Sequence, residues 1–169
     1  MNGNKKLLAC IITVLALILL AAVIMIVMNG VNPGKLKYGI FGEIGELEAL
    51  NEYVVSENEP AADKRLNGLN VVRDWRRTVK VDSSSCEVCA YEFATHEDAE
   101  AYYKAVSNRT KANEGANGCA SAGGLFGKAE YVTMFEDRVL TVTGRSIGDI
   151  VSVLNVFFEK CPEALKPFS

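Results

Sequence analysis

The stretch Ala129–Gly144, AEYVTMFEDRVLTVTG, carries the clearest structural pattern in this chain. Two runs rich in β-branched, aromatic and other apolar residues are separated by the polar pair Glu136-Asp137. This pattern is typical of a β-hairpin that turns at the polar pair. Because the two strands of a hairpin are antiparallel neighbours, the stretch predicts an antiparallel sheet.

An amphipathic helix is expected directly after this hairpin. Ser146 is followed three residues later by Asp149, a capping pattern that marks a helix start. The apolar residues that follow share one helical face, and they are Ile147, Ile150, Val151, Leu154, Phe157 and Phe158. Pro162 then ends the predicted helix.

The same two patterns occur upstream. Cys86–Ala94, CEVCAYEFA, predicts a strand, and an earlier strand is expected in Arg76–Val81. Thr95 precedes Asp98 in a second capping pattern. A helix is expected after it, with apolar positions at Ala99, Tyr102, Tyr103 and Val106.

These elements predict an α+β domain. Each helix has one apolar stripe to bury, and the simplest solution is an antiparallel sheet with the helices packed on one face. A ferredoxin-like connectivity is one candidate. A short amphipathic helix around Ile44, Leu47, Leu50 and Val54 precedes the sheet. A long loop, Asn108–Gly127, separates the first helix from the hairpin and begins with the glycosylation sequon Asn108-Arg109-Thr110.

The segment Leu7–Met28 predicts one N-terminal transmembrane helix. It contains no charged residue, and it is longer than the roughly 20 residues that cross a bilayer. The apolar region of a cleaved signal peptide is shorter, about 7 to 15 residues. We therefore divide the chain into a tail (1–6), a transmembrane anchor (7–28), a linker (29–37) and a soluble α+β domain (38–169).

The orientation of this anchor follows from the lysines around it. Lys5 and Lys6 directly precede the apolar run, whereas Lys35 and Lys37 lie beyond the helix end. We favour a cytoplasmic N-terminus, with the domain outside the cytoplasm at the cell membrane. All 21 acidic residues follow the anchor, and this acidic balance disfavours nucleic acid as a partner.

Cys86 and Cys89 form the one C-x-x-C motif. A redox pair needs its first thiol at a helix N-terminus, and zinc usually needs a second close pair of ligands, which is missing. In a strand, residues three apart point to opposite faces, although a later strand start would let a tight turn bring the two together. Outside the cytoplasm, Cys86, Cys89, Cys119 and Cys161 could form disulfides of open connectivity. The alternative is that they are buried free thiols.

The best candidate for a ligand site is a basic cluster around the only tryptophan, formed by Arg73, Trp75, Arg76, Arg77 and Lys80. Arginine forks suit phosphate or carboxylate groups, and an indole ring can stack on a sugar or a base. The alternative is a solvated edge strand, on which basic side chains discourage pairing and Trp75 belongs to the core.

No catalytic constellation, metal-ligand set or cofactor motif accompanies these features, so we expect a protein that is not an enzyme and has no cofactor. The sequence favours a single-pass, membrane-anchored protein whose extracytoplasmic domain binds an unknown protein or envelope ligand. One alternative is a thiol-redox or zinc-binding protein that uses Cys86 and Cys89. Another is an accessory subunit of a membrane complex.

Overall fold

The computed structural model describes residues 11–20, 43–56, 59–107, 118–121 and 127–162. The chain divides into two compact units, Met1–Gly30 and Val31–Ser169. In the first unit, residues 11–20 form an α-helix whose side chains are exposed. The second unit contains the sheet and all of the elements described below.

The second unit has an α+β fold built on a five-stranded antiparallel sheet with the strand order β1-β2-β5-β4-β3. Its elements in chain order are η2 (Ile44–Tyr53), η3 (Lys64–Leu66), β1 (Val71–Val81), β2 (Ser84–Phe93), α2 (His96–Ser107), β3 (Gly118–Ser121), β4 (Ala129–Phe135), β5 (Arg138–Gly144) and α3 (Ile147–Lys160). The predicted hairpin is confirmed, since β4 and β5 pair up to Phe135 and Arg138 around the expected turn.

Both predicted helix starts are confirmed by their capping hydrogen bonds. At α3, the Ser146 hydroxyl accepts a bond from the Asp149 backbone N–H at 3.2 Å. The Asp149 carboxylate in turn accepts one from the Ser146 N–H at 3.1 Å. At α2, the Thr95 hydroxyl accepts a bond from the Asp98 N–H at 3.2 Å. These bonds satisfy backbone donors that a helix start would otherwise leave without a partner.

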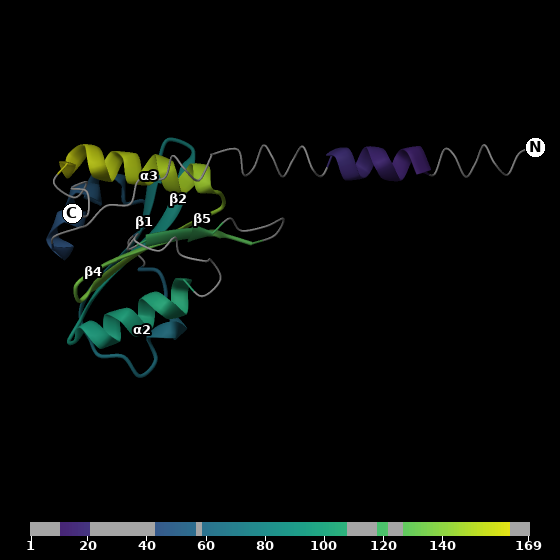
Figure 1. Ribbon diagram of the computed structural model, residues 1–169. Coiled ribbons are helices and arrows are strands. Elements are labelled where there is room, and N and C mark those ends of the chain that lie inside the picture. The colour runs from purple at the N-terminus through teal and green to yellow at the C-terminus, as the bar shows by residue number, and fades with distance from the viewer. Residues whose placement is uncertain (1–10, 21–42, 57–58, 108–117, 122–126, 163–169) are drawn as a thin grey trace, which may run out of the picture. The chain divides into compact units, whose positions relative to one another are not determined.

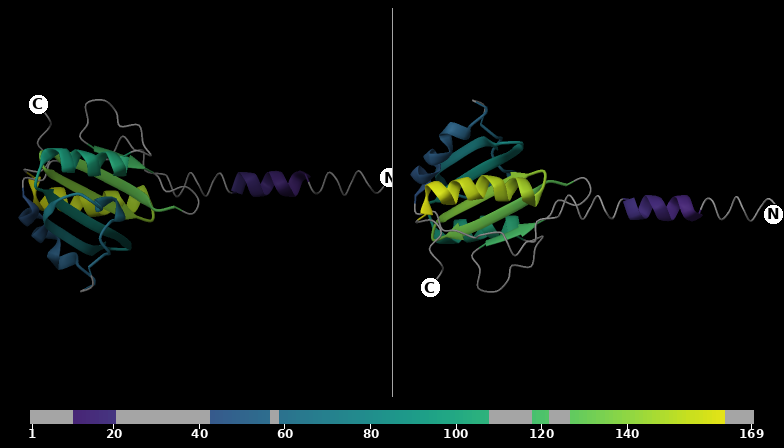
Figure 2. Two further views of the ribbon diagram at one scale, coloured as in Figure 1. Left: turned by 90° about the horizontal axis from the view of Figure 1, so that it is seen from below. Right: turned by 90° about the horizontal axis from the view of Figure 1, so that it is seen from above.

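The helices cover both faces of the sheet, so the expectation that they pack on one face is wrong. Helices α2 and α3 lie on opposite sides of the sheet in Figures 1 and 2. Along β2, Val88 and Ala90 belong to the core beneath α3, whereas Tyr91 and Phe93 belong to the core beneath α2. A strand with apolar residues on both of its faces requires a cover on each side.

The connectivity is not ferredoxin-like either. A ferredoxin-like chain runs strand, helix, strand, strand, helix, strand. Here β1 and β2 form a hairpin before α2, and β3, β4 and β5 follow as consecutive antiparallel neighbours before α3. Strand β3 lies inside the stretch predicted to be a loop. It pairs with β4, from Gly118 opposite Thr133 to Ser121 opposite Glu130.

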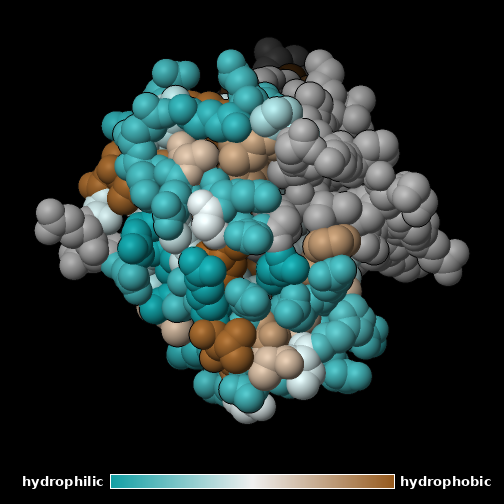
Figure 3. Space-filling model, turned by 90° about the vertical axis from the view of Figure 1, so that its left-hand side faces the viewer, coloured by the Kyte–Doolittle hydropathy of each residue, from teal (hydrophilic) through white to brown (hydrophobic). Residues whose placement is uncertain are grey.

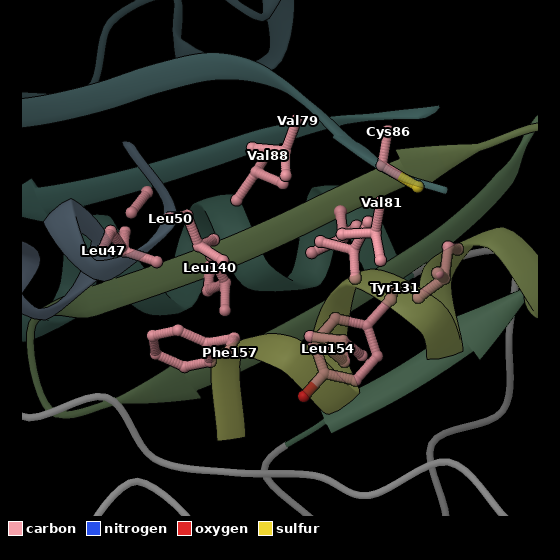
Figure 4. Packing of buried hydrophobic residues seen from close by; sticks show 14 of the residues in the cluster. Leu47, Leu50, Val79, Val81, Cys86, Val88, Tyr131, Leu140, Leu154 and Phe157 are labelled. Carbon is pink, nitrogen blue, oxygen red and sulfur yellow. The ribbon is translucent and has the colours of Figure 1, made fainter. Parts of the chain in front are cut away.

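The larger core lies between the sheet and α3. Figure 4 shows Leu140, Val88 and Val79 of the sheet facing Phe157 and Leu154 of α3. The predicted short helix before the sheet is present as the 3-10 helix η2. Its three buried residues, Ile44, Leu47 and Leu50, extend the same core.

Part of the predicted anchor is helical. No helix among the described residues is long and apolar enough to span a bilayer. Of the expected span 7–28, the structure describes residues 11–20, which are α-helical. The tail (1–6), the linker (29–37), the remainder of the span and the sequon at Asn108 lie outside the described residues.

Candidate functional site

The predicted basic cluster on β1 is divided between the two faces of the sheet. Trp75 is buried in the core beneath α3. The Arg77 guanidinium lies 5.8 Å from the centroid of its ring. Alternation along the strand places Arg73 on the same face as Trp75 and Arg77, and places Arg76 and Lys80 on the other face. The five residues therefore do not converge on one ligand.

The two central arginines of this cluster are engaged within the protein. Arg76 contacts Glu59 at 3.0 Å and Asp74 at 2.5 Å, and it donates to the carbonyl of Pro60 at 2.7 Å. Arg77 contacts the same Glu59 carboxylate at 2.5 Å. Strand β1 is an edge strand, so this arrangement favours the interpretation of the cluster as a solvated sheet edge.

Cys86 and Cys89 lie on opposite faces of β2, as the strand pattern predicted. Cys86 is 1% exposed in the core beneath α3, and Cys89 packs against the core beneath α2. Both are free thiols, as is Cys161, whose S–H donates to the carbonyl of Glu46 at 3.6 Å.

The fold also places Cys161 and Cys119 far along the chain backbone from this pair. Cys86 lies near the start of α3. A Cβ added to Gly144 would be 2.9 Å from Cys86 Sγ and 3.4 Å from Ile150, which is in the first turn of that helix. Cys161 follows the last turn of α3, about 16 Å further along that helix. In the sheet register, Cys89 pairs with Thr141, Thr141 with Val132, and Val132 with Cys119. The backbones at Cys89 and Cys119 are therefore three strand spacings apart, or about 14 Å. A disulfide needs Cα atoms within about 7 Å of each other.

Burial suppresses the reactivity of both motif thiols. It raises the pKa of Cys86 to about 12, with a further contribution from the charges of Asp149 and Glu87. Burial also raises the pKa of Cys89 to about 11, against the lowering effect of a hydrogen bond with Tyr91. The thiolate is the nucleophile and the metal ligand, and it is scarce at these pKa values. Within the described residues, no group of His, Cys, Asp and Glu side chains is placed to hold a metal ion.

We expect Cys86 and Cys89 to react with iodoacetamide about 100-fold more slowly in the native protein than in guanidinium chloride at neutral pH. The reason is that a pKa near 11 or 12 leaves almost no thiolate. Both cysteines lie in one tryptic peptide, Val81–Lys104, so fragmentation of this peptide by tandem mass spectrometry assigns the rate to each of them. Equal native and denatured rates for Cys89 would show that it is an accessible, reactive thiol.

Cys86 has a packing role beneath Gly144. We expect Gly144→Ala to lower the free energy of unfolding by about 1–3 kcal/mol, because the new Cβ would meet Cys86 Sγ at 2.9 Å. In the Cys86→Ala background the same substitution should cost less, since the obstructing sulfur is gone. Urea unfolding of the four proteins gives this double-mutant cycle. Strictly additive effects would show that the two residues do not touch.

The face of the sheet beneath α2 is polar at one end and apolar at the other. The paired residues across β2, β5 and β4 form rows: Glu87, Thr143 and Glu130, then Cys89, Thr141 and Val132, then Tyr91, Val139 and Met134. Helix α2 packs on the apolar end through Tyr102 and Val106. The row of Glu87, Thr143 and Glu130 lies outside this apolar packing and is here called the polar floor.

Residues 59–66, here called the strap, connect the β1 edge to this floor. Arg65 forms a forked contact with Glu130 of β4, with N–O distances of 3.2 and 2.6 Å. Its Nε also donates to Asp63 at 2.7 Å. Asp63 accepts a further bond from the hydroxyl of Tyr102 on α2 at 3.0 Å. The strap is therefore held to both β4 and α2 by charged and polar contacts.

The electrostatics keep Asp63 and Arg65 ionised at neutral pH. Burial pushes the pKa of Asp63 upward, but hydrogen bonds and charge from Arg65, with a bond from Tyr102, outweigh it and lower the pKa below 3.8. Burial likewise pushes the pKa of Arg65 downward, and its bonds to Glu130 and Asp63 raise it overall. Two carboxylates and one guanidinium thus form a compact ionic network.

We expect Asp63→Asn to lower the free energy of unfolding by about 1 kcal/mol at pH 7, a modest value because the network is partly exposed to solvent. A carboxyl whose pKa is lowered by folding stabilises the folded state at every pH above its pKa in the unfolded chain, which is near 3.8. This stabilisation is lost as the pH falls through the pKa of the carboxyl in the folded protein. The difference between wild type and variant should therefore shrink as the pH falls from 7 to 3. Urea unfolding at pH 7 and pH 3 measures it, and a constant difference would contradict an ionic role.

The polar floor, the strap and the end of α2 enclose a groove. It consists of three adjoining hollows with volumes of about 260, 480 and 230 Å³, and Thr143 lines all three. The first hollow lies between the strap residues Asp63 and Arg65 and the residues Cys89 and Thr141 of the row next to the polar floor. The groove residues of interest are Asp63, Lys64, Arg65, Ser85, Glu87, Lys128, Glu130, Thr143 and Arg145. Sequence reasoning missed this site, because its residues come from separate segments and form no motif.

Comparison with protein-family models, curated proteins and solved structures gives no match for this chain. What the groove does must therefore be inferred from its own residues. Those residues combine hydroxyl groups with charges of both signs in a partly enclosed space, and this combination is suited to a polar ligand.

Proposed function

We propose that this chain is a single-pass membrane protein whose α+β domain lies outside the cytoplasm and binds a small polar ligand in the groove. The groove carries the binding part of this proposal, because its three hollows share a floor of hydroxyl and charged side chains. The uncharged segment Leu7–Met28, preceded by Lys5 and Lys6, supports the membrane anchor and its orientation.

Binding is favoured over catalysis by the state of the charged groups in the groove. Arg65 is engaged by Asp63 and Glu130, and Lys128 is engaged by Glu87 at 3.0 Å. The chain's single histidine, His96, has its Nδ1 2.6 Å from the carbonyl of Glu136 in the β4–β5 turn. That turn is at the far end of the hairpin from Lys128 and Arg145. No activated nucleophile and base meet among the residues that line the groove.

The face shown in Figure 3 is better suited to a small polar ligand than to a partner with a broad apolar surface. On the face shown in Figure 3, hydrophilic residues predominate, and hydrophobic residues gather only in small patches. A docking surface for a protein partner usually presents a larger continuous apolar area. The buried, separated thiols of Cys86 and Cys89 weigh against the redox and zinc alternative.

The binding proposal is tested by thermal denaturation of the full chain in detergent with a panel of sugars, amino acids, carboxylates and phosphates. A ligand that binds the folded state raises the melting temperature. We expect at least one compound to stabilise the wild type and to lose its effect in Thr143→Trp, which fills the centre of the groove. Thr143→Gln is a milder second variant, and Arg73→Gln is the control outside the groove. Equal stabilisation of all four proteins would exclude the groove as the site.

The anchor is tested separately by fractionation of cells that express the chain. The full chain should remain in the membrane pellet through an alkaline carbonate wash, because a spanning helix resists extraction. A chain that lacks residues 1–28 should be released. Release of the full chain by the same wash would exclude the anchor.

A further inference from the structure

The open end of the groove is formed by the row of residues next to Thr143. The register pairs Cys86 with Gly144 and Gly144 with Ala129 across β2, β5 and β4. One residue beyond these pairs are Ser85 next to Cys86, Arg145 next to Gly144, and Lys128 next to Ala129. They lie on three neighbouring backbone segments with a spacing of about 4.8 Å. All three residues line the hollow of about 230 Å³. Arg145 is therefore the middle residue of the row.

This hollow has an excess of positive charge in an acidic protein. Its charged residues are Lys128, Arg145 and Glu87, whereas the whole chain has a formal net charge of -3. Glu87 contacts Lys128 at 3.0 Å. Arg145 is exposed and has no ion-pair partner among the described residues. Among the residues that the structure describes, this guanidinium is therefore a cationic fork without an ion pair at the mouth of the groove.

The same hollow supplies neutral donors around this charge. The hydroxyl-bearing residues Ser85, Thr143 and Thr78 line it, together with the backbone of Gly144. A planar guanidinium binds the oxygens of a carboxylate or phosphate in pairs, and hydroxyl groups can donate to the remaining oxygens. The arginines at the β1 edge differ in this respect, because Glu59 already occupies the forks of Arg76 and Arg77.

We propose that this open end is an anion site, in which Arg145, with the hydroxyls of Ser85 and Thr143, holds a carboxylate or phosphate group of the ligand. Lys128 keeps its contact with Glu87 and adds positive charge beside the site. The inference rests on the proposed function and specifies its ligand as an anion. The rest of such a molecule extends along the floor beneath the strap. Its polar groups there meet Thr143 and the ionic network of Asp63, Arg65 and Glu130.

The test is a titration of the ¹⁵N-labelled full chain in detergent micelles, followed by NMR. Inorganic phosphate and acetate are added in separate series, which distinguishes a phosphate site from a carboxylate site. We expect saturable shifts at the amides of Ser85, Gly144 and Arg145 with at least one of the two anions. Arg145→Gln should weaken that binding about tenfold, since it removes a charged hydrogen-bond donor. Arg73→Gln removes the same charge from an exposed position on β1 that has no ion pair within the described part of the chain, and it should leave the affinity unchanged.

Two results would overturn the anion site. One is the absence of saturable shifts with either anion. The other is an equal loss of affinity in Arg145→Gln and Arg73→Gln, which would reflect net charge only. Neither result would affect the Thr143→Trp comparison, in which a neutral ligand can still mark the groove. Failure of the anion site is therefore distinguishable from failure of the proposed function.

Discussion

Replacement of Phe157 by alanine should lower the free energy of unfolding by about 3–5 kcal/mol. Phe157 is 1% exposed and lies in the core between α3 and the sheet, with its ring centroid 5.4 Å from that of Phe158. Truncation would remove a large apolar side chain and leave a cavity beneath the helix. Urea unfolding followed by circular dichroism measures the change.

Asn155→Ala is the matched control for this substitution, because Asn155 is exposed on the same helix. Its effect should stay within about 0.5 kcal/mol, which is usual for surface positions. If Phe157→Ala were as mild as this control, α3 would not be packed on the sheet through the face that the structure assigns to it.

Tyr102→Ala should destabilise the protein by a similar amount, about 3–5 kcal/mol. Tyr102 of α2 is fully buried on the side of the helix that faces the sheet. The centroid of its ring is 5.3 Å from that of Tyr91 and 5.6 Å from that of Phe93. Tyr102→Phe keeps the ring and removes only the hydroxyl that donates to Asp63. Its cost should be about 1 kcal/mol.

The pair of Tyr102 variants tests the cover on the second face of the sheet. A mild effect of Tyr102→Ala beside a severe effect of Phe157→Ala would mean that α3 alone covers the sheet. Equal effects of Tyr102→Ala and Tyr102→Phe would mean that the hydroxyl contact matters and the ring packing does not. The measurement is the same urea unfolding experiment.

The elements that could be predicted from the sequence are those with a local cause. The β4–β5 hairpin has a polar turn between apolar runs, and Ser146 and Thr95 cap the helices with their own hydroxyl groups. Each of these signals depends on residues within one turn or one hairpin. Such contacts form between neighbours along the chain, so a reader of the sequence can recognise them.

The arrangement of these elements could not be predicted in the same way. A stripe such as that of α3 shows which side of a helix is buried, but it does not show which face of the sheet receives it. Tyr91 and Phe93 on one face of β2, with Val88 and Ala90 on the other, were the available sign of a sheet covered on both sides. Strand β3 has four small residues, Gly118–Ser121, and it is defined by pairing with β4.

The candidate site shows the same division between local and distant causes. The β1 cluster looked convergent because Arg73, Arg76 and Arg77 are close in sequence, yet strand alternation sends them to opposite faces. The groove instead depends on contacts such as Arg65 with Glu130, which are 65 residues apart. A contact of this kind becomes visible only when the path of the strap over the sheet is known.

The placement of the domain outside the cytoplasm is tested most directly by cysteine labelling in intact cells. Val72 is 60% exposed on β1, so Val72→Cys presents an accessible thiol in the domain, and Asn4→Cys marks the N-terminal tail. The wild type gives the background from the native cysteines. With a membrane-impermeant maleimide, we expect Val72→Cys to label in intact cells and Asn4→Cys to label only after lysis. The opposite pattern, or labelling of both thiols only after lysis, would contradict an extracytoplasmic domain on a membrane anchor.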